Sequence, residues 1–169
     1  MNRADVYAAA KAHEAAVIQQ LIDRGWRAHA FGQGLLPPDL CDCLTHYEDH
    51  ARRPSLVRWF PDVIAGYTVS PWRTFVAVID AKMCGADRPN YAIEVAALDV
   101  AEHFADRLYT PMFFVFDDWH VLTPRDVRQR GRQGPDATNG SGTPYVLVAK
   151  QHGRPFDSVF RTLTTKAGA

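Results

Sequence analysis

Two carboxylates and a lysine stand where strand-like sequence gives way to polar residues. Pro61-Asp62 follows one apolar stretch, and Asp80-Ala81-Lys82 comes 18 positions after Asp62, at the end of the most apolar run in the chain. Successive strand residues point to opposite faces, so Asp80 and Lys82 project from the same face. A charge at the end of a buried strand costs free energy unless it is paired or bound to a metal. The spacing therefore indicates that these side chains act together.

Glu14 is a third acidic residue in an apolar setting. Four apolar residues surround it on a predicted helix, at positions i−4, i+3, i+4 and i+7: Ala10, Val17, Ile18 and Leu21. If Glu14, Asp62 and Asp80 converge, their oxygens make a site suited to a hard divalent cation such as Mg2+.

Hydrophobic periodicity predicts the elements that would position these residues. Helices are predicted over residues 4–24, 38–50 and 90–108, and strands over 26–31, 57–60, 63–67, 74–82, 112–116, 119–122 and 145–149. The helix at 38–50 is interpreted as an insertion, and the Arg-, Gly- and Ser-rich residues 128–143 as a mobile loop. This order predicts one α/β or α+β domain over residues 1–169, built around a mixed sheet.

The acidic and lysine residues resemble the motif of the PD-(D/E)XK nuclease superfamily, which includes restriction endonucleases, Holliday-junction resolvases and repair nucleases. Pro61-Asp62 stands for the first half of the motif, and Asp80-Ala81-Lys82 for the second. Glu14 stands for the acidic residue that many members carry on the first core helix. The resemblance implies a restriction-endonuclease-like α/β fold, a mixed sheet flanked by helices in the order α-β-β-β-α-β. The small size looks most like a junction resolvase or a repair nuclease.

The resemblance also implies Mg2+-dependent hydrolysis of DNA phosphodiesters, with Mn2+ as a substitute ion, leaving a 5′-phosphate and a 3′-hydroxyl. Asp62, Asp80 and the backbone carbonyl of Ala81 would bind the metal, and Glu14 would hold a second ion or a water molecule of the metal. Lys82 would orient the attacking water and stabilise charge on the phosphate. Two auxiliary residues, Tyr91 and Glu94, are expected at the start of the following helix.

The net charge of zero hides an asymmetry between the two parts of the chain. Residues 1–120 hold 11 Lys and Arg against 16 Asp and Glu, whereas residues 121–169 hold 8 against 3. A basic segment beside an acidic body is expected if one part contacts DNA while the other holds metal ions. The candidate phosphate contacts are Arg52, Arg53, Arg58, Arg125, Arg128, Arg130, Arg132, Lys150 and Arg154. An unevenly charged surface and a solvated loop remain the alternatives.

Several other interpretations are weighed against these. Cys41, Cys43, His46 and His50 offer zinc ligands, but on one helix their spacing is poor for a tetrahedral site. Asp117 and Asp118 are better explained by a hairpin turn than by metal binding. No membrane span or signal peptide is recognised, so we expect a cytoplasmic protein with reduced cysteines. A homodimer stays open, as does a catalytically silent protein of this fold that binds nucleic acid or a protein partner.

Overall fold

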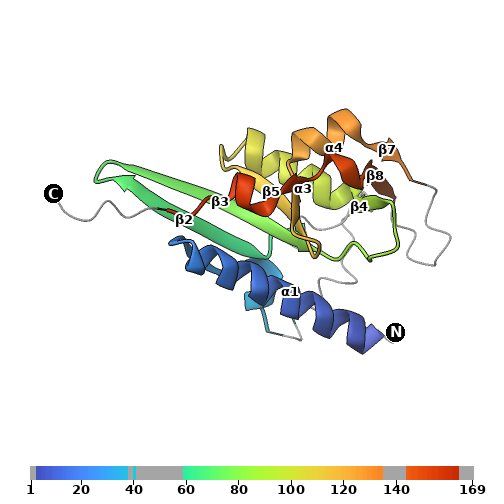
Figure 1. Ribbon diagram of the computed structural model, residues 1–169, viewed down its shortest axis with the longest axis horizontal. Coiled ribbons are helices and arrows are strands. Elements are labelled where there is room, and N and C mark those ends of the chain that lie inside the picture. The colour runs from blue at the N-terminus through green and yellow to red at the C-terminus, as the bar shows by residue number, and fades with distance from the viewer. Residues whose placement is uncertain (1–2, 38–39, 41–58, 135–143, 164–169) are drawn as a thin grey trace.

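The computed structural model describes residues 3–37, 40, 59–134 and 144–163 (Figure 1). In chain order the described elements are α1 (Arg3–Asp23), β1 (Arg27–Ala30), the 3-10 helix η1 (Gly32–Leu35), β2 (Val63–Ser70), β3 (Arg73–Lys82), β4 (Asn90–Glu94), α3 (Val95–Asp106), β5 (Met112–Phe116), β6 (His120–Leu122), α4 (Pro124–Arg130), β7 (Arg132–Gln133), β8 (Tyr145–Ala149), η3 (Lys150–His152), β9 (Arg154–Pro155) and α5 (Phe156–Val159). Their strands form a mixed sheet in the order β1-β2-β3-β5-β6-β9 and a small sheet in the order β4-β8-β7.

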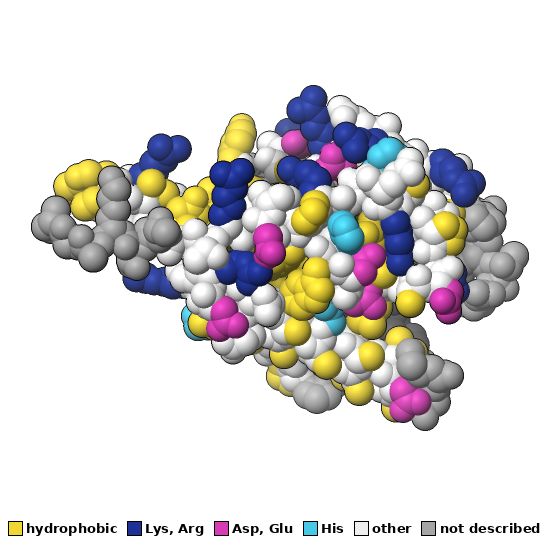
Figure 2. Space-filling model, in the orientation of Figure 1, with side chains coloured by type: hydrophobic (Ala, Val, Ile, Leu, Met, Phe, Trp, Pro, Cys, Tyr) yellow, Lys and Arg dark blue, Asp and Glu magenta, His cyan; other side chains and the backbone are white. Residues whose placement is uncertain are grey.

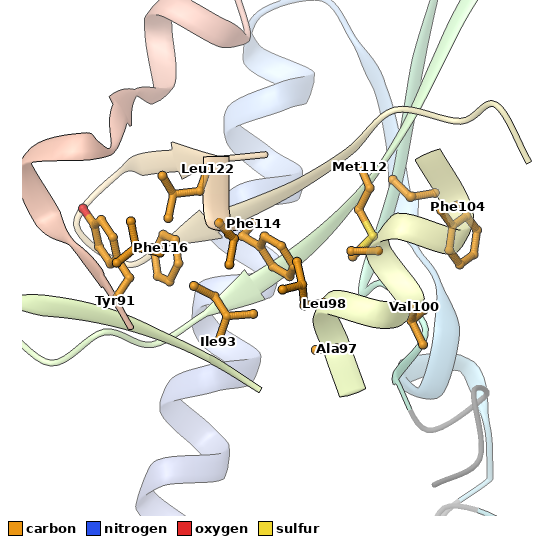
Figure 3. Packing of buried hydrophobic residues seen from close by; sticks show 14 of the residues in the cluster. Tyr91, Ile93, Ala97, Leu98, Val100, Phe104, Met112, Phe114, Phe116 and Leu122 are labelled. Carbon is orange, nitrogen blue, oxygen red and sulfur yellow. The ribbon is translucent and has the colours of Figure 1, made fainter. Parts of the chain in front are cut away.

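The large sheet is buried on both faces, because its strands alternate between two hydrophobic cores. Val78 and Phe114 pack in one core with α3, α4 and the small sheet (Figure 3). Ile79 and Val115, their chain neighbours, pack in the other core with α1 and α5. The helices therefore flank the sheet from opposite sides (Figure 1). This explains the continuous apolar runs in β3 and β5, since a strand covered on both faces needs no polar side.

The register of β3 determines where its polar end lies. β2 runs antiparallel to β3 and begins at Val63, opposite Ile79. β5 runs parallel to β3, and that pairing continues to Lys82, opposite Phe116. Asp80, Ala81 and Lys82 thus extend past the point where β2 begins.

Most predicted elements are confirmed, with three differences. Asn90–Glu94, predicted as helix, is strand β4, because Tyr91 and Ile93 alternate with polar or small residues and pair with β8. Trp59 and Phe60, predicted as strand, are not in a strand. The rest of that prediction and the predicted insertion at 38–50, apart from Leu40, lie outside the described residues. Of the helices that the structure describes, none combines the length and the apolarity needed to cross a membrane.

The third difference concerns the predicted loop at 128–143. Residues 128–130 end helix α4, and Arg132–Gln133 form β7, so the first part of the predicted loop has regular secondary structure. Thr123 and Asp126 form a capping box at the start of α4, with Pro124 in the first turn. This Thr-Pro-x-Asp pattern is a helix-start signal that the periodicity argument overlooked. Residues 135–143 lie outside the described part of the chain.

Candidate active site

Asp62 is held at the edge of the sheet by the backbone on both sides of it. Its carbonyl accepts a hydrogen bond from the N–H of Phe31 at 2.7 Å, which ties it to the end of β1. Its Oδ2 accepts the N–H of Ala81 at 2.9 Å. Because β2 pairs with β3 only up to Ile79, the Asp62 side chain takes the place that a further strand residue would fill. The carboxylate therefore lies against the last residues of β3.

Gly32 allows this arrangement to form. It has a φ of +62°, and a Cβ at this position would lie 2.5 Å from the carbonyl oxygen of Pro61. A glycine adopts such a backbone conformation without steric cost, and no other residue fits so close to a backbone oxygen. The turn after β1 can thus pass directly against Pro61-Asp62.

Asp80 and Lys82 form an ion pair on the face of the sheet that α3 covers. Asp80 is 6% exposed. The Nζ of Lys82 lies 3.0 Å from the Oδ2 of Asp80 and 3.8 Å from the Oε2 of Glu94. Burial opposes the charge of Lys82, but the surrounding carboxylates, Asp80 first and then Glu94 and Asp62, outweigh it and raise the pKa of the lysine. Lys82 is therefore a fixed cation among acidic groups.

Glu14 approaches the same edge from α1, on the opposite face of the sheet. Its Oε2 accepts a charge-assisted hydrogen bond from the Nζ of Lys11 at 2.7 Å. Burial lowers the pKa of Lys11, but the hydrogen bond and charge of Glu14 raise it above its ordinary value, with a smaller contribution from Asp62. Sequence reasoning missed Lys11, although its i, i+3 spacing from Glu14 on the predicted helix could have indicated the pair.

The site carries more negative charge than its lysines compensate. Burial, followed by repulsion from Asp80 and Glu14, raises the pKa of Asp62 to about 8, although Lys82 and the N–H of Ala81 act in the opposite direction. Clustered carboxylate oxygens with an excess of negative charge are the donor set that Mg2+ or Mn2+ prefers. The residues therefore fit a divalent cation by their chemistry. Within the described residues no group of three His, Cys, Asp or Glu side chains is arranged around one metal position, since Asp80 faces Lys82 and Asp62 faces Ala81.

The two predicted auxiliary residues lie in different places. Glu94 is the last residue of β4 and the N-cap residue of α3, which brings it to Lys82. Tyr91 stacks on Phe116 with ring centroids 3.9 Å apart, and its hydroxyl donates to Asp118 at 3.1 Å. Tyr91 is thus part of the core beside the turn, and its hydroxyl is committed to Asp118. Asp117 and Asp118 form that turn between β5 and β6, as the sequence predicted.

The predicted DNA-contacting residues are scattered, and some already pair with carboxylates. Arg128 bonds to Glu102 at 2.6 Å and to Asp99 at 2.8 Å. Figure 2 shows dark-blue Lys and Arg side chains over the α4–β7 end of the molecule with acidic side chains among them. The other described members of the set are either paired or exposed: Lys150 near Asp118, Arg154 near Asp126, Arg130 against His152, and the exposed Arg125 and Arg132. Charge on Arg128 is therefore largely compensated within the protein.

Other predicted residues fall outside the described chain. These are Arg52, Arg53 and Arg58 of the basic set and the candidate zinc ligands Cys41, Cys43, His46 and His50. Cys84 is described, and it is a free, buried thiol.

Comparisons with known proteins bear on the fold. No protein-family model matches the sequence, and no curated protein matches it. Among solved structures, the chain is similar to Hjc of Archaeoglobus fulgidus, a Holliday junction resolvase from an archaeal hyperthermophile. The similarity covers 89% of this chain and 98% of that chain, with a TM-score of 0.50 and 12% sequence identity. The chain thus has the mixed α/β fold expected from its sequence, a mixed sheet flanked by helices, and shares that fold with a resolvase.

Proposed function

We propose that this protein is a metal-dependent nuclease that hydrolyses phosphodiester bonds of DNA. One observation carries the proposal: Asp62 and the Asp80–Lys82 pair lie at the same edge of the sheet, where β3 extends past the start of β2. A buried ion pair costs free energy in desolvation, so it is weak evidence for a purely stabilising role. The excess of carboxylates around it favours a site that takes up a cation.

In this proposal the acidic residues hold the metal. Asp62 and Asp80, with the carbonyl of Ala81, would bind Mg2+ or Mn2+, and Glu14 would hold a second ion or a water molecule of the metal. A divalent cation in such a site neutralises charge on the phosphate and makes a water molecule more acidic. Metal binding must displace the proton that the raised pKa of Asp62 retains, so binding should strengthen as the pH rises towards 8.

Lys82 has a separate role. Its ammonium group is a compact charge that can bind a non-bridging oxygen of the scissile phosphate and orient the attacking water. Glu94 and Asp80 hold this group in place from two sides. Lys11 holds the carboxylate of Glu14 in the same way. The resemblance to PD-(D/E)XK nucleases implies that the products would be a 5′-phosphate and a 3′-hydroxyl.

Structural similarity to a Holliday junction resolvase supports branched DNA as the substrate class. We place the phosphate contacts outside the active site on the exposed arginines, Arg125, Arg130 and Arg132. The compartment in this proposal is the cytoplasm. A homodimer stays a prediction, which sedimentation of the purified protein tests.

The test is cleavage by the purified protein of linear, circular, branched and single-stranded DNA with Mg2+, with Mn2+ and with EDTA. We expect cleavage that requires the metal and is lost in Asp80→Asn, because the amide keeps the shape of the side chain and removes its charge. Asp87→Asn, a change of an exposed carboxylate in the β3–β4 loop, is the matched control and should cleave as wild type. Binding of DNA without cleavage under every metal condition would favour the catalytically silent alternative.

A further inference from the structure

The hairpin of β2 and β3 projects from the body of the protein and carries an exposed tryptophan at its tip. Figure 1 shows the two strands extending beyond the helices at the end opposite the N-terminus. Trp72 lies in the turn between the strands and is 95% exposed. Val69 and Val76, on the two strands behind it, are 52% and 42% exposed. Figure 2 shows yellow side chains gathered at this end of the molecule.

The hairpin is braced at its base. Trp26 contacts Tyr67 and Phe75 edge-on, with ring centroids 4.6 Å and 5.8 Å apart, and Tyr67 lies against Phe75. These aromatic contacts join the residue before β1 to β2 and β3, just behind the projecting part. The strands that carry Trp72 are thus supported by packing a few residues behind the tip.

The charge around the tip is positive. Residues 63–79 contain one charged side chain, that of Arg73, and no Asp or Glu. On the neighbouring strand, Arg27 is exposed beside the hairpin. A flat apolar ring beside the guanidinium group of Arg73, with no carboxylate in residues 63–79, matches a ligand that combines aromatic faces with negative charge. Nucleic acid has both.

We propose that Trp72 stacks on a base pair laid open at a discontinuity in duplex DNA, such as a branch point. The inference rests on the proposed nuclease function and assigns a residue that recognises the branch, remote from the active site. In an intact duplex the ring could enter only by unstacking two base pairs, which costs a few kcal/mol per step. A single ring with one adjacent arginine offers little to offset that cost. At a branch the terminal base pairs already expose their faces, so stacking is favourable there.

The tip and the active site can contact the same DNA molecule. Trp72 precedes Asp80 by eight residues of β3, a span of roughly 26 Å at about 3.3 Å per residue. Along a duplex this corresponds to roughly eight base pairs. One arm of a branched substrate therefore reaches from the open base pair at the tip to the carboxylates.

The test measures binding of the full-length protein in EDTA, where no cleavage interferes. The probes are a four-way junction with arms of about 20 base pairs, long enough for this span, and a linear duplex of the same sequence. All arm and duplex ends are closed by hairpin loops, so that only the branch point of the junction offers an open base pair. We expect Trp72→Ala to weaken junction binding roughly 5- to 160-fold, the range for one stacked base, and to change linear-duplex binding less than about twofold. Trp72→Phe should restore most of the junction affinity. Tyr109→Ala, which removes a side chain that is 87% exposed in the loop before β5, is the control and should bind as wild type.

Three results would overturn the inference. Equal junction affinity of Trp72→Ala and wild type would mean that the ring does not stack, and an equal loss on both probes would mean that it contacts duplex without selecting a branch. Conversion of a wild-type dimer to a monomer by Trp72→Ala, measured by sedimentation, would assign the hairpin to contact between copies of the chain. The nuclease proposal is tested separately: metal-dependent cleavage by wild type upholds it even if Trp72 is dispensable, and failure of wild type to bind or cleave any DNA refutes both.

Discussion

Replacing Asp62 by Asn should stabilise the metal-free protein at neutral and alkaline pH. The amide oxygen of the new side chain can still accept the N–H of Ala81, so the local hydrogen bond is kept. In wild type, burial of the Asp62 carboxylate and repulsion from Asp80 and Glu14 raise its pKa from 3.8 to about 8. The uncharged amide is free of both effects. Between those pH values folded wild type retains a proton that the unfolded chain has released. The free energy of unfolding of wild type therefore falls as the pH rises through this window.

The size of the effect follows from the pKa shift. One pKa unit corresponds to about 1.4 kcal/mol, so wild type should lose about 3 kcal/mol of stability from this group between about pH 5 and pH 7. The amide in Asp62→Asn has no proton to release, and its contribution should be constant. At pH 7 the variant should be more stable than wild type by about 4 kcal/mol. This figure corresponds to the roughly three pH units between the pKa of the unfolded chain, 3.8, and pH 7.

The assay is urea unfolding in EDTA across this pH range, followed by tryptophan fluorescence. Groups far from the site affect both proteins equally, so the difference between wild type and variant reports Asp62 together with the carboxylates that repel it, Asp80 and Glu14. Asp87→Asn is the control and should track wild type within about 0.5 kcal/mol. Added Mg2+ should stabilise wild type more at pH 8 than at pH 6 and should stabilise Asp62→Asn little. A variant that is less stable than wild type at pH 7, or a difference that does not grow with pH, would refute the reasoning.

Three further changes test the surroundings of the site. Gly32→Ala places a Cβ against the carbonyl of Pro61 at positive φ, so it should lower the free energy of unfolding in urea by about 1–3 kcal/mol and weaken stabilisation by Mg2+. If the variant matched wild type in both stability and stabilisation by Mg2+, Gly32 would not support Asp62. Arg128→Ala should leave the salt dependence of DNA affinity unchanged, because its charge is already paired with Glu102 and Asp99. Arg130→Ala should flatten the slope of log K against the logarithm of the salt concentration by about 0.9. The opposite order would show that Arg128 exchanges its carboxylate partners for phosphate. Lys82→Met should abolish cleavage. It should also destabilise the metal-free protein by about 3 kcal/mol, because it leaves the buried carboxylate of Asp80 without its counter-charge. Cleavage at the wild-type rate would exclude Lys82 from the reaction.

The sequence alone predicted most of the local secondary structure, and it contains the residues of the motif. The run ending in Asp80 indicates a strand buried on both faces, and the structure buries Val78 in one core and Ile79 in the other. The strands at 112–116 and 145–149 agree with the structure residue for residue. Such predictions succeed because side-chain periodicity follows from the backbone geometry of neighbouring residues.

Contacts between distant segments were decided by the tertiary structure. Asn90–Glu94 carries a pattern compatible with the start of a helix, and its pairing with β8, more than fifty residues away, makes it a strand. That pairing ends at Glu94 and so brings its carboxylate to Lys82. The compensation of Arg128 by Glu102 and the exposure of Trp72 on a projecting hairpin also depend on how the layers pack. Local sequence specifies which side chains share a face, but only the folded chain determines which charges meet, because their energies depend on distances between residues far apart in the sequence.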